Sequence, residues 1–166
     1  SFHLHMYTSI PFKPEWAIEF AQAGLDEIRF HLLDLQAERY RDSIAACSRA
    51  GILTGVEIPC EPDREVDLFE LLETLRDFEV SFLNLNELEI TVGNHHNMEL
   101  RGFNISTEIT AGAAGSAELA MKMRDRVLAA GRGESDPIDS QTREAYGYHL
   151  KFCTAVYKDA GQLRRR

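Results

Sequence analysis

The chain has 166 residues, 44% of them hydrophobic, which is enough for one ordinary domain with its own core. Its net charge of −9, from 27 acidic and 18 basic side chains, argues against nucleic acid or an anionic membrane surface as the main partner. No apolar run approaches the roughly 20 residues of a membrane span. The 3 cysteines are too few and too widely spaced for a disulfide framework, so we expect a cytoplasmic protein.

Three successive units fill the first half of the chain, each an amphipathic helix, a turn and a short strand. The predicted helices cover residues 14–23, 37–50 and 66–78, and the predicted strands cover 2–8, 27–32, 53–59 and 80–88. Strands that alternate with helices at this spacing predict right-handed βαβ units around a parallel sheet. Because a complete eight-fold barrel needs about 250 residues, we expect an α/β fold that is either an open sheet or a partial (β/α) barrel.

The repeat fades after residue 106, so we predict a partial barrel over 1–106 and a helix-and-strand extension packed on it over 107–166. Within the extension, Ser116 is a candidate N-cap for a helix over 117–130. A loop is expected over 131–140, and the alternating pattern over 148–156 predicts a further strand.

Two pairs of metal-ligating residue types stand apart from the repeat. His95 and His96 lie in an Asn-His-His-Asn sequence that predicts a surface loop, and His149 and Cys153 are expected to share one face of the last strand. Because two ligands are too few for a metal site, the roles of these four residues stay open.

Polar side chains occupy every second position of the predicted strands, whereas a parallel strand covered on both faces is almost entirely apolar. Side chains alternate between the two faces of a strand, so the polar residues of each strand share one face. This set consists of His3, His5, Tyr7, Glu27, Arg29, His31, Glu57, Asn84 and Asn86. Because buried polar groups without partners are costly, we expect the apolar set to face the helices and the polar set to line a solvated ligand site.

The end of the fourth strand is the densest part of this pattern, with two amides and two carboxylates between Asn84 and Glu89. The carboxyl ends of parallel strands are where α/β proteins bind ligands. An internal ion-pair network of Arg29, His31 and Glu57, with no ligand, is the alternative interpretation.

Three sequence blocks carry a family resemblance. In order, they are Gly24-Leu-Asp-Glu-Ile-Arg-Phe-His31, Gly55-Val-Glu-Ile-Pro59 and Phe82-Leu-Asn-Leu-Asn-Glu-Leu-Glu89. In this order and spacing the chain resembles the archaeal radical S-adenosylmethionine (SAM) proteins related to the pyruvate formate-lyase activating enzymes. The tail, with Tyr148-His-Leu-Lys-Phe-Cys153, Tyr157-Lys-Asp159 and Gln162-Leu-Arg164, resembles the end of the same group.

The resemblance implies a partial (β/α)6 barrel in which the four predicted strands are the third to the sixth. It also implies SAM and a [4Fe–4S] cluster as cofactors, and a small-molecule, peptide or protein substrate. The C-x3-C-x2-C loop that holds the cluster is absent from this chain, and so is the glycine-rich segment that meets the methionyl amine of SAM. The chain is therefore either the C-terminal part of a longer enzyme or a degenerate member of the group. We expect the first, a part that is inactive alone and has the N-terminal part of the barrel as its partner.

In this interpretation the SAM-contacting residues are Arg29, His31, Glu57, Asn84 and Asn86, and the substrate-contacting residues are His5, Tyr7, Glu87 and Glu89. No metal ligands are assigned within the chain.

Two other functions fit the same polar strands. A divalent-metal barrel isomerase or hydrolase would use His3, His5, His31, Glu57 and Glu87 as ligands and general base. A non-catalytic domain that only binds or completes a partner would need no chemistry at all. A C-x3-C-x2-C sequence upstream of Ser1 would decide for radical chemistry.

Overall fold

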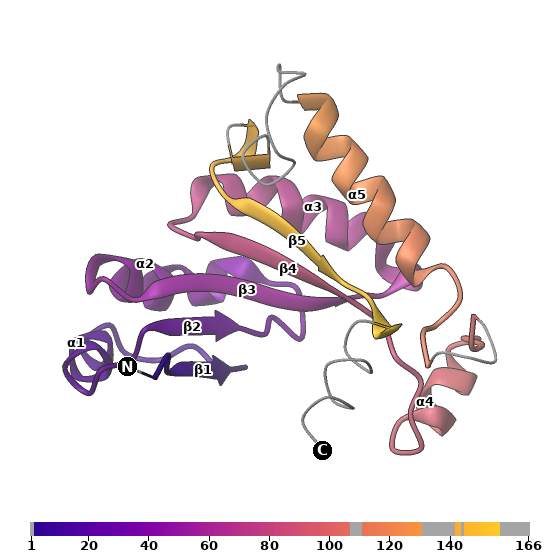
Figure 1. Ribbon diagram of the computed structural model, residues 1–166, viewed down its shortest axis with the longest axis horizontal. Helices are drawn as coiled ribbons and strands as arrows, with labels where there is room; N and C mark the ends of the chain where they lie inside the picture. The colour runs from indigo at the N-terminus through magenta and orange to yellow at the C-terminus, as the bar shows by residue number, and fades with distance from the viewer. Residues whose placement is uncertain (1, 107–110, 131–141, 144, 157–166) are drawn as a thin grey trace.

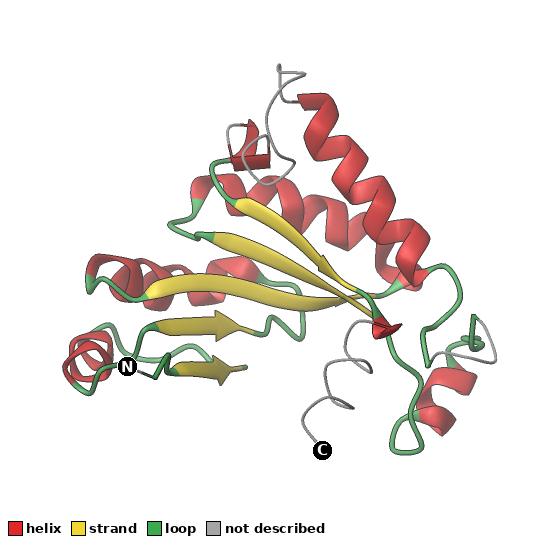
Figure 2. Cartoon of the chain, viewed as in Figure 1, coloured by secondary structure: helices red, strands yellow, loops and turns green. Residues whose placement is uncertain are grey.

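A computed structural model describes residues 2–106, 111–130, 142–143 and 145–156. Within these residues, five strands form one sheet in the order β1-β2-β3-β4-β5, and every neighbouring pair is parallel (Figure 1). The strand direction turns between β1 and β5, as the twist of parallel sheets requires (Figure 2). The α/β fold with a parallel sheet, consistent with a partial barrel, is therefore confirmed.

The elements follow one another in the predicted alternation. In chain order they are β1 (His5–Thr8), α1 (Glu15–Gln22), β2 (Glu27–Phe30), the 3-10 turn η1 (Ala37–Tyr40), α2 (Arg41–Arg49), β3 (Leu53–Cys60), η2 (Pro62–Arg64), α3 (Glu65–Thr74), η3 (Leu75–Asp77), β4 (Phe82–Glu87), α4 (His95–Leu100), α5 (Ser116–Ala130) and β5 (His149–Cys153). β1 is shorter than predicted because the Leu4 N–H donates to the carboxylate of Asp26 (2.8 Å) instead of continuing a strand ladder.

One face of the sheet packs against helices α1, α2, α3 and α5, which Figure 1 shows gathered on one side of the strands. The strand residues on this side are the predicted apolar set, and they are fully buried: Ile28, Phe30, Val56, Ile58, Leu83 and Leu85. Burying a side chain of this size stabilises the fold by about 1.5–3 kcal/mol. The prediction that the apolar set faces the helices is confirmed.

The segment after residue 106 contributes α5 and β5, and β5 lies beside β4 in the same sheet. The predicted strand over 148–156 is present, in the shorter range His149–Cys153. The domain boundary near residue 106 stays a prediction, and the predicted loop over 131–140 lies outside the described residues.

The Ser116 side chain does not cap α5, so that prediction is wrong. The buried hydroxyl donates to the carbonyl of Cys60 (2.7 Å) and accepts from the N–H of Leu88 (2.8 Å). It therefore joins the carboxyl ends of β3 and β4, which fixes how these two strands enter the loops that follow them.

The segment predicted as a surface loop contains the short helix α4, which begins at His95. His95 and His96 are exposed, while Met98 on the same helix packs with Leu88 and Ile90 in a small separate core. Histidine and asparagine are modest helix formers, so it is this tertiary contact that favours the helix. Among the described residues, no helix combines the length and apolarity needed to cross a bilayer.

Candidate functional site: the polar face of the sheet

The side of the sheet turned away from the helices carries the predicted polar residues. The strand register places Tyr7 beside Arg29 and Glu57 beside Asn84, because parallel strands keep side chains of the same parity on one face. We call this surface the polar face; it consists of His5, Tyr7, Glu27, Arg29, Glu57, Phe82, Asn84, Asn86, Lys151 and Cys153.

Arg29 is the centre of the polar face. Its guanidinium donates to Glu27, to Glu57 Oε2 (2.7 Å) and to the Tyr7 hydroxyl (3.1 Å). Burial alone would lower the pKa of Arg29, but the hydrogen bonds to the two carboxylates outweigh burial and raise it. Arg29 is therefore charged at every accessible pH, and its charge is already matched by neighbouring carboxylates.

Glu57 on β3 links the middle strands. Its Oε1 accepts from Asn86 Nδ2 (2.9 Å), while its Oε2 accepts from Arg29. Burial by itself raises the pKa of Glu57, but hydrogen bonds from Asn86, Asn84 and Arg29 hold it below its ordinary value. Glu57 is therefore ionised at neutral pH, which suits a residue that positions its neighbours better than one that transfers protons.

Asn84 is buried, with 5% of its surface exposed, yet it is incompletely bonded. Its Nδ2 donates to Asn86 Oδ1 at 3.5 Å, and its Oδ1 accepts no hydrogen bond from the described residues. Exchanging the amide oxygen and nitrogen would turn an oxygen toward Asn86 Oδ1 and the Glu57 carboxylate, so the present orientation is the favourable one. A buried acceptor without a protein donor is unusual, and an ordered water or a ligand can supply the donor.

A pocket of about 300 Å³ opens beside Asn84, lined by Arg29, Phe82, Asn84, Lys151, Phe152 and Cys153. The Phe82 ring lies close to two cations: Arg29 Cζ is 5.5 Å and Lys151 Nζ is 4.8 Å from the ring centroid. Gly55 makes room for this ring, because a Cβ at residue 55 would lie 2.1 Å from Phe82 Cζ.

The remaining predicted site residues lie at the edge of the polar face or outside it. His5 is exposed on β1 and its ring meets Tyr7 edge-on, with centroids 5.5 Å apart. His31 follows β2, where its N–H donates to the Thr8 carbonyl (2.8 Å). Among the described residues, the His31 ring takes no part in the hydrogen bonds and ion pairs of the polar face.

Glu87 and Glu89 do not join the polar face. Glu87 has the parity of Leu85, so it lies on the other side of β4, where it accepts a hydrogen bond from the Ala155 N–H (2.7 Å). Glu89 lies beyond β4, in a segment that bridges Gly112 in antiparallel fashion. Neither carboxylate is therefore part of the polar face, and their assignment to the substrate stays a prediction.

Four residues of the polar face are absent from the predicted SAM and substrate contacts: Glu27, Phe82, Lys151 and Cys153. The alternation of β2 already placed Glu27 on the polar face. Lys151 follows from the register of β5 against β4, which joins residues more than 60 positions apart and has no local sequence signal.

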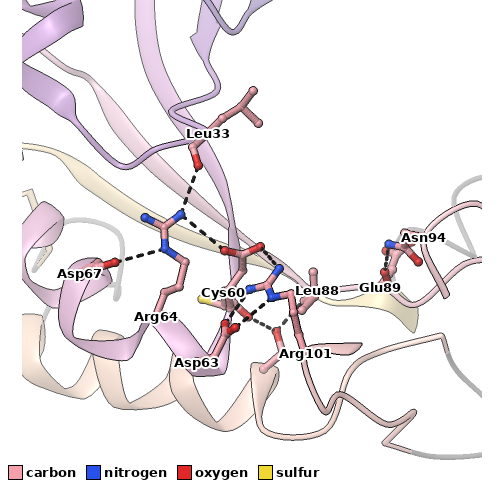
Figure 3. Close-up of polar contacts among 11 residues, drawn as sticks. Leu33, Cys60, Asp63, Arg64, Asp67, Leu88, Glu89, Asn94 and Arg101 are labelled. Atoms are coloured by element: carbon pink, nitrogen blue, oxygen red, sulfur yellow. Dashed lines mark hydrogen bonds and ion pairs between the residues drawn. The ribbon is translucent and has the colours of Figure 1, made fainter. Parts of the chain in front are cut away.

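The loops at the carboxyl ends of the strands are tied together by two arginines (Figure 3). Arg64 donates to the Leu33 carbonyl (3.2 Å) and to Asp67 (3.2 Å). Arg101, just after α4, holds the Asp63 carboxylate with two hydrogen bonds of 2.6 and 2.9 Å. These contacts connect the loops after β2 and β3 with one another and with α4.

The described residues do not by themselves form a binding site for an iron–sulfur cluster. Cys47 and Cys60 are buried on the helix side, where burial raises the pKa of Cys47 to about 11 and that of Cys60 to about 12. Cluster ligands are thiolates, and Cys153 is on the opposite face of the sheet. No group of three His, Cys, Asp or Glu residues that could hold a metal ion occurs in the part of the chain that the structure describes.

A comparison with curated proteins identifies a protein that is similar to this chain. The chain is 32% identical, over 178 aligned positions, to "Putative glycyl-radical enzyme activating enzyme MJ0021" of Methanocaldococcus jannaschii, and the alignment covers 99% of this chain and 42% of that protein. The chain thus spans less than half the length of this curated relative. No protein-family model matches the chain, and no solved structure matches it. This relative confirms the resemblance to the activating enzymes of glycyl-radical enzymes that the sequence blocks indicate.

Proposed function

We propose that this chain forms the SAM- and substrate-contacting wall of a radical SAM activating enzyme, and that the rest of the enzyme supplies the iron–sulfur cluster. The observation that carries the proposal is the assembled polar face, in which Glu57 accepts hydrogen bonds from Arg29 and Asn86, and the buried Asn84 Oδ1 has no donor among the described residues. The description of the relative as a glycyl-radical enzyme activating enzyme supports the same reaction class.

When bound, SAM and the reduced cluster supply the chemistry that removes a hydrogen atom from the substrate. The residues of this chain bind and orient. Asn84 Oδ1 accepts from a ligand N–H or O–H, while Glu57 and Arg29 hold Asn86 and Tyr7 in place around it. His31, beyond the end of β2, remains a proposed contact of the bound cofactor.

The unpaired edge of β1 is where we propose that the rest of the barrel docks. Within the described residues β1 pairs only with β2, so its other backbone edge is free for a further strand. Apolar side chains near this edge are exposed, including Phe2 (94%), Leu4 (51%) and Ile10 (69%). We propose that preceding β/α units of the enzyme dock here and cover them.

The proposed substrate of the whole enzyme is a glycyl-radical enzyme, because that is the substrate that the relative's name gives. We also propose a cytoplasmic location, since all the cysteines among the described residues are free thiols.

The test uses the full-length protein, purified without oxygen and loaded with iron and sulfide, in an equilibrium dialysis measurement of SAM binding. We expect Asn84→Ala to weaken SAM binding about tenfold, the effect of losing one good hydrogen bond in a dry site. Asn97→Ala, at an exposed asparagine of α4, is the matched control and should change nothing. SAM binding that is unaltered by Asn84→Ala would remove Asn84 from the cofactor site, and a gene without C-x3-C-x2-C upstream would refute the radical chemistry.

A further inference from the structure

The outer edge of β5 has no neighbouring strand among the described residues. β5 pairs only with β4 there, and the His149 N–H donates to the Ser81 carbonyl (3.0 Å). Because successive residues of a strand direct their backbone groups to opposite edges, the N–H and C=O groups of Leu150 and Phe152 point away from β4. The Leu150 N–H donates to Thr142 Oγ1 (3.1 Å), which leaves the two carbonyls and the Phe152 N–H for a further strand.

A pocket opens beside this edge on the helix side of the sheet. Helix α5 packs mainly on β3 and β4, so the space between α5 and β5 is incompletely filled and has a volume of about 350 Å³. Its lining is mostly apolar and consists of Leu85, Ala120, Met121, Arg124, Leu150, Lys151 and Phe152. Since the pocket of about 300 Å³ on the polar face is also lined by Lys151 and Phe152, an added strand has space for side chains on both of its faces.

The charge on β5 indicates which strand fits. Lys151 is exposed, and its ammonium contacts the ring of Phe82, with no carboxylate partner among the described residues. A second copy of β5, paired residue for residue, would place two Lys151 side chains next to each other, which is unfavourable. A carboxylate directly opposite Lys151 is favourable instead, so charge complementarity points to a different strand with an acidic residue at that position.

We propose that the outer edge of β5 binds an extended segment of a partner protein, with an acidic residue opposite Lys151 and an aliphatic residue on either side of it. The aliphatic side chains face α5, because side chains alternate between the two faces of a strand. Main-chain hydrogen bonds hold such a segment, and the pockets select its side chains. A docked helix would leave the outward carbonyls and the Phe152 N–H without partners. The inference goes beyond the proposed function, since neither SAM nor the cluster takes part in it.

Short peptides with blocked ends test the side-chain pattern on the full-length protein. The probe has the sequence Thr-Val-Glu-Val-Thr and carries fluorescein, so that its binding is measured by fluorescence anisotropy. We expect lysine in place of the central glutamate to weaken binding about fivefold, because like charges then lie side by side. Serine in place of both valines should weaken it at least about tenfold, because the buried apolar surface is lost. A probe that does not bind would refute the proposal.

Methylation of the peptide backbone separates strand pairing from contact through side chains alone. One probe carries an N-methyl group on the central glutamate, and another carries N-methyl groups on both valines. Successive N–H groups of a strand point to opposite edges, so only one of these two sets faces β5. One methylated probe should therefore bind more than about tenfold more weakly, while the other binds like the parent peptide. Equal binding of the two methylated probes would overturn the assignment of an added strand.

A charge reversal on the protein locates the bound peptide. Lys151→Glu should reverse the preference, so that the probe with central lysine binds more tightly than the probe with central glutamate. Lys13→Glu, at an exposed lysine before α1, is the matched control and should keep the original preference. A preference for glutamate that survives Lys151→Glu would place the peptide elsewhere.

Sedimentation of the full-length protein decides between a partner protein and a second copy. We expect the same sedimentation coefficient with and without the unlabelled probe. A dimer that the probe dissociates would assign the β5 edge to a second copy of the protein and overturn the partner.

Discussion

The two faces of β4 show two kinds of burial within one strand. Leu83 and Leu85 point to the helices and are fully buried among apolar side chains. Asn84 points the other way and is nearly as inaccessible, yet its Oδ1 lacks a donor in the described part of the chain. The helix side is complete as a core, whereas the polar face contains a buried group that folding alone does not satisfy. This difference is the physical reason for placing a binding surface on one face only.

The largest expected change in the free energy of unfolding separates two neighbouring residues of β4. Leu85→Ala should lower the free energy of unfolding by about 2–5 kcal/mol, because it leaves a cavity in the helix-facing core. Asn84→Ala should cost less than about 1 kcal/mol, since only a long hydrogen bond of 3.5 Å and a contact with Glu57 are lost. Urea unfolding followed by circular dichroism measures both, and equal losses would mean that Asn84 is an ordinary structural residue.

A substitution that crowds the polar face should have the next largest effect on the free energy of unfolding. Gly55→Ala places a Cβ 2.1 Å from Phe82 Cζ, so the ring must move, at a cost of about 1–3 kcal/mol. The control is Gly93→Ala, where the nearest atom is Thr91 Oγ1 at 3.9 Å and a change within about 0.5 kcal/mol is expected. A Gly55→Ala protein as stable as the wild type would show that Phe82 is not held against β3.

A smaller effect concerns pH and the ion pair of Glu57. Its pKa is below the ordinary value in the folded protein, so the unfolded chain binds more protons as the solution becomes acidic. The stability that Glu57 contributes, of the order of 1 kcal/mol, is present above about pH 5 and is lost as pH falls through the folded pKa. We expect the stability difference between wild type and Glu57→Gln to shrink on acidification. A difference that grows toward low pH would contradict the assigned direction.

The smallest expected effect is on cysteine reactivity. Alkylation of the native protein compares the thiols on the two sides of the sheet without a substitution. Burial raises the pKa of Cys47 to about 11 and that of Cys60 to about 12, so both are almost entirely protonated at pH 8. Iodoacetamide at that pH should modify Cys153, on the polar face, at least about a hundredfold faster than either. Mass spectrometry of peptides from the native protein checks this, and rapid modification of Cys60 would mean that the helix side opens easily.

The period-two pattern of the strands was sufficient to predict which residues share the polar face. The positions of Arg29, Glu57, Asn84 and Asn86 on this face follow from parity alone, and the same parity places Glu87 on the other face of β4.

Other features depend on contacts that a local pattern cannot contain. Lys151 reaches the pocket through the pairing of β5 with β4, and α4 forms because Met98 packs into a small core. The hydroxyl of Ser116 bonds the ends of two distant strands, and this long-range use replaces the local helix cap that its sequence position suggests. In each case the partner lies outside the element itself, so tertiary structure decides between options that local propensity leaves equal.

A crystal structure of the full-length protein with SAM and the iron–sulfur cluster tests the central claim most directly. The account predicts that SAM lies on the polar face, with one of its N–H or O–H groups within hydrogen-bond distance of Asn84 Oδ1. Electron density for SAM elsewhere, with the amide of Asn84 still unpaired or satisfied only by the protein, would contradict it.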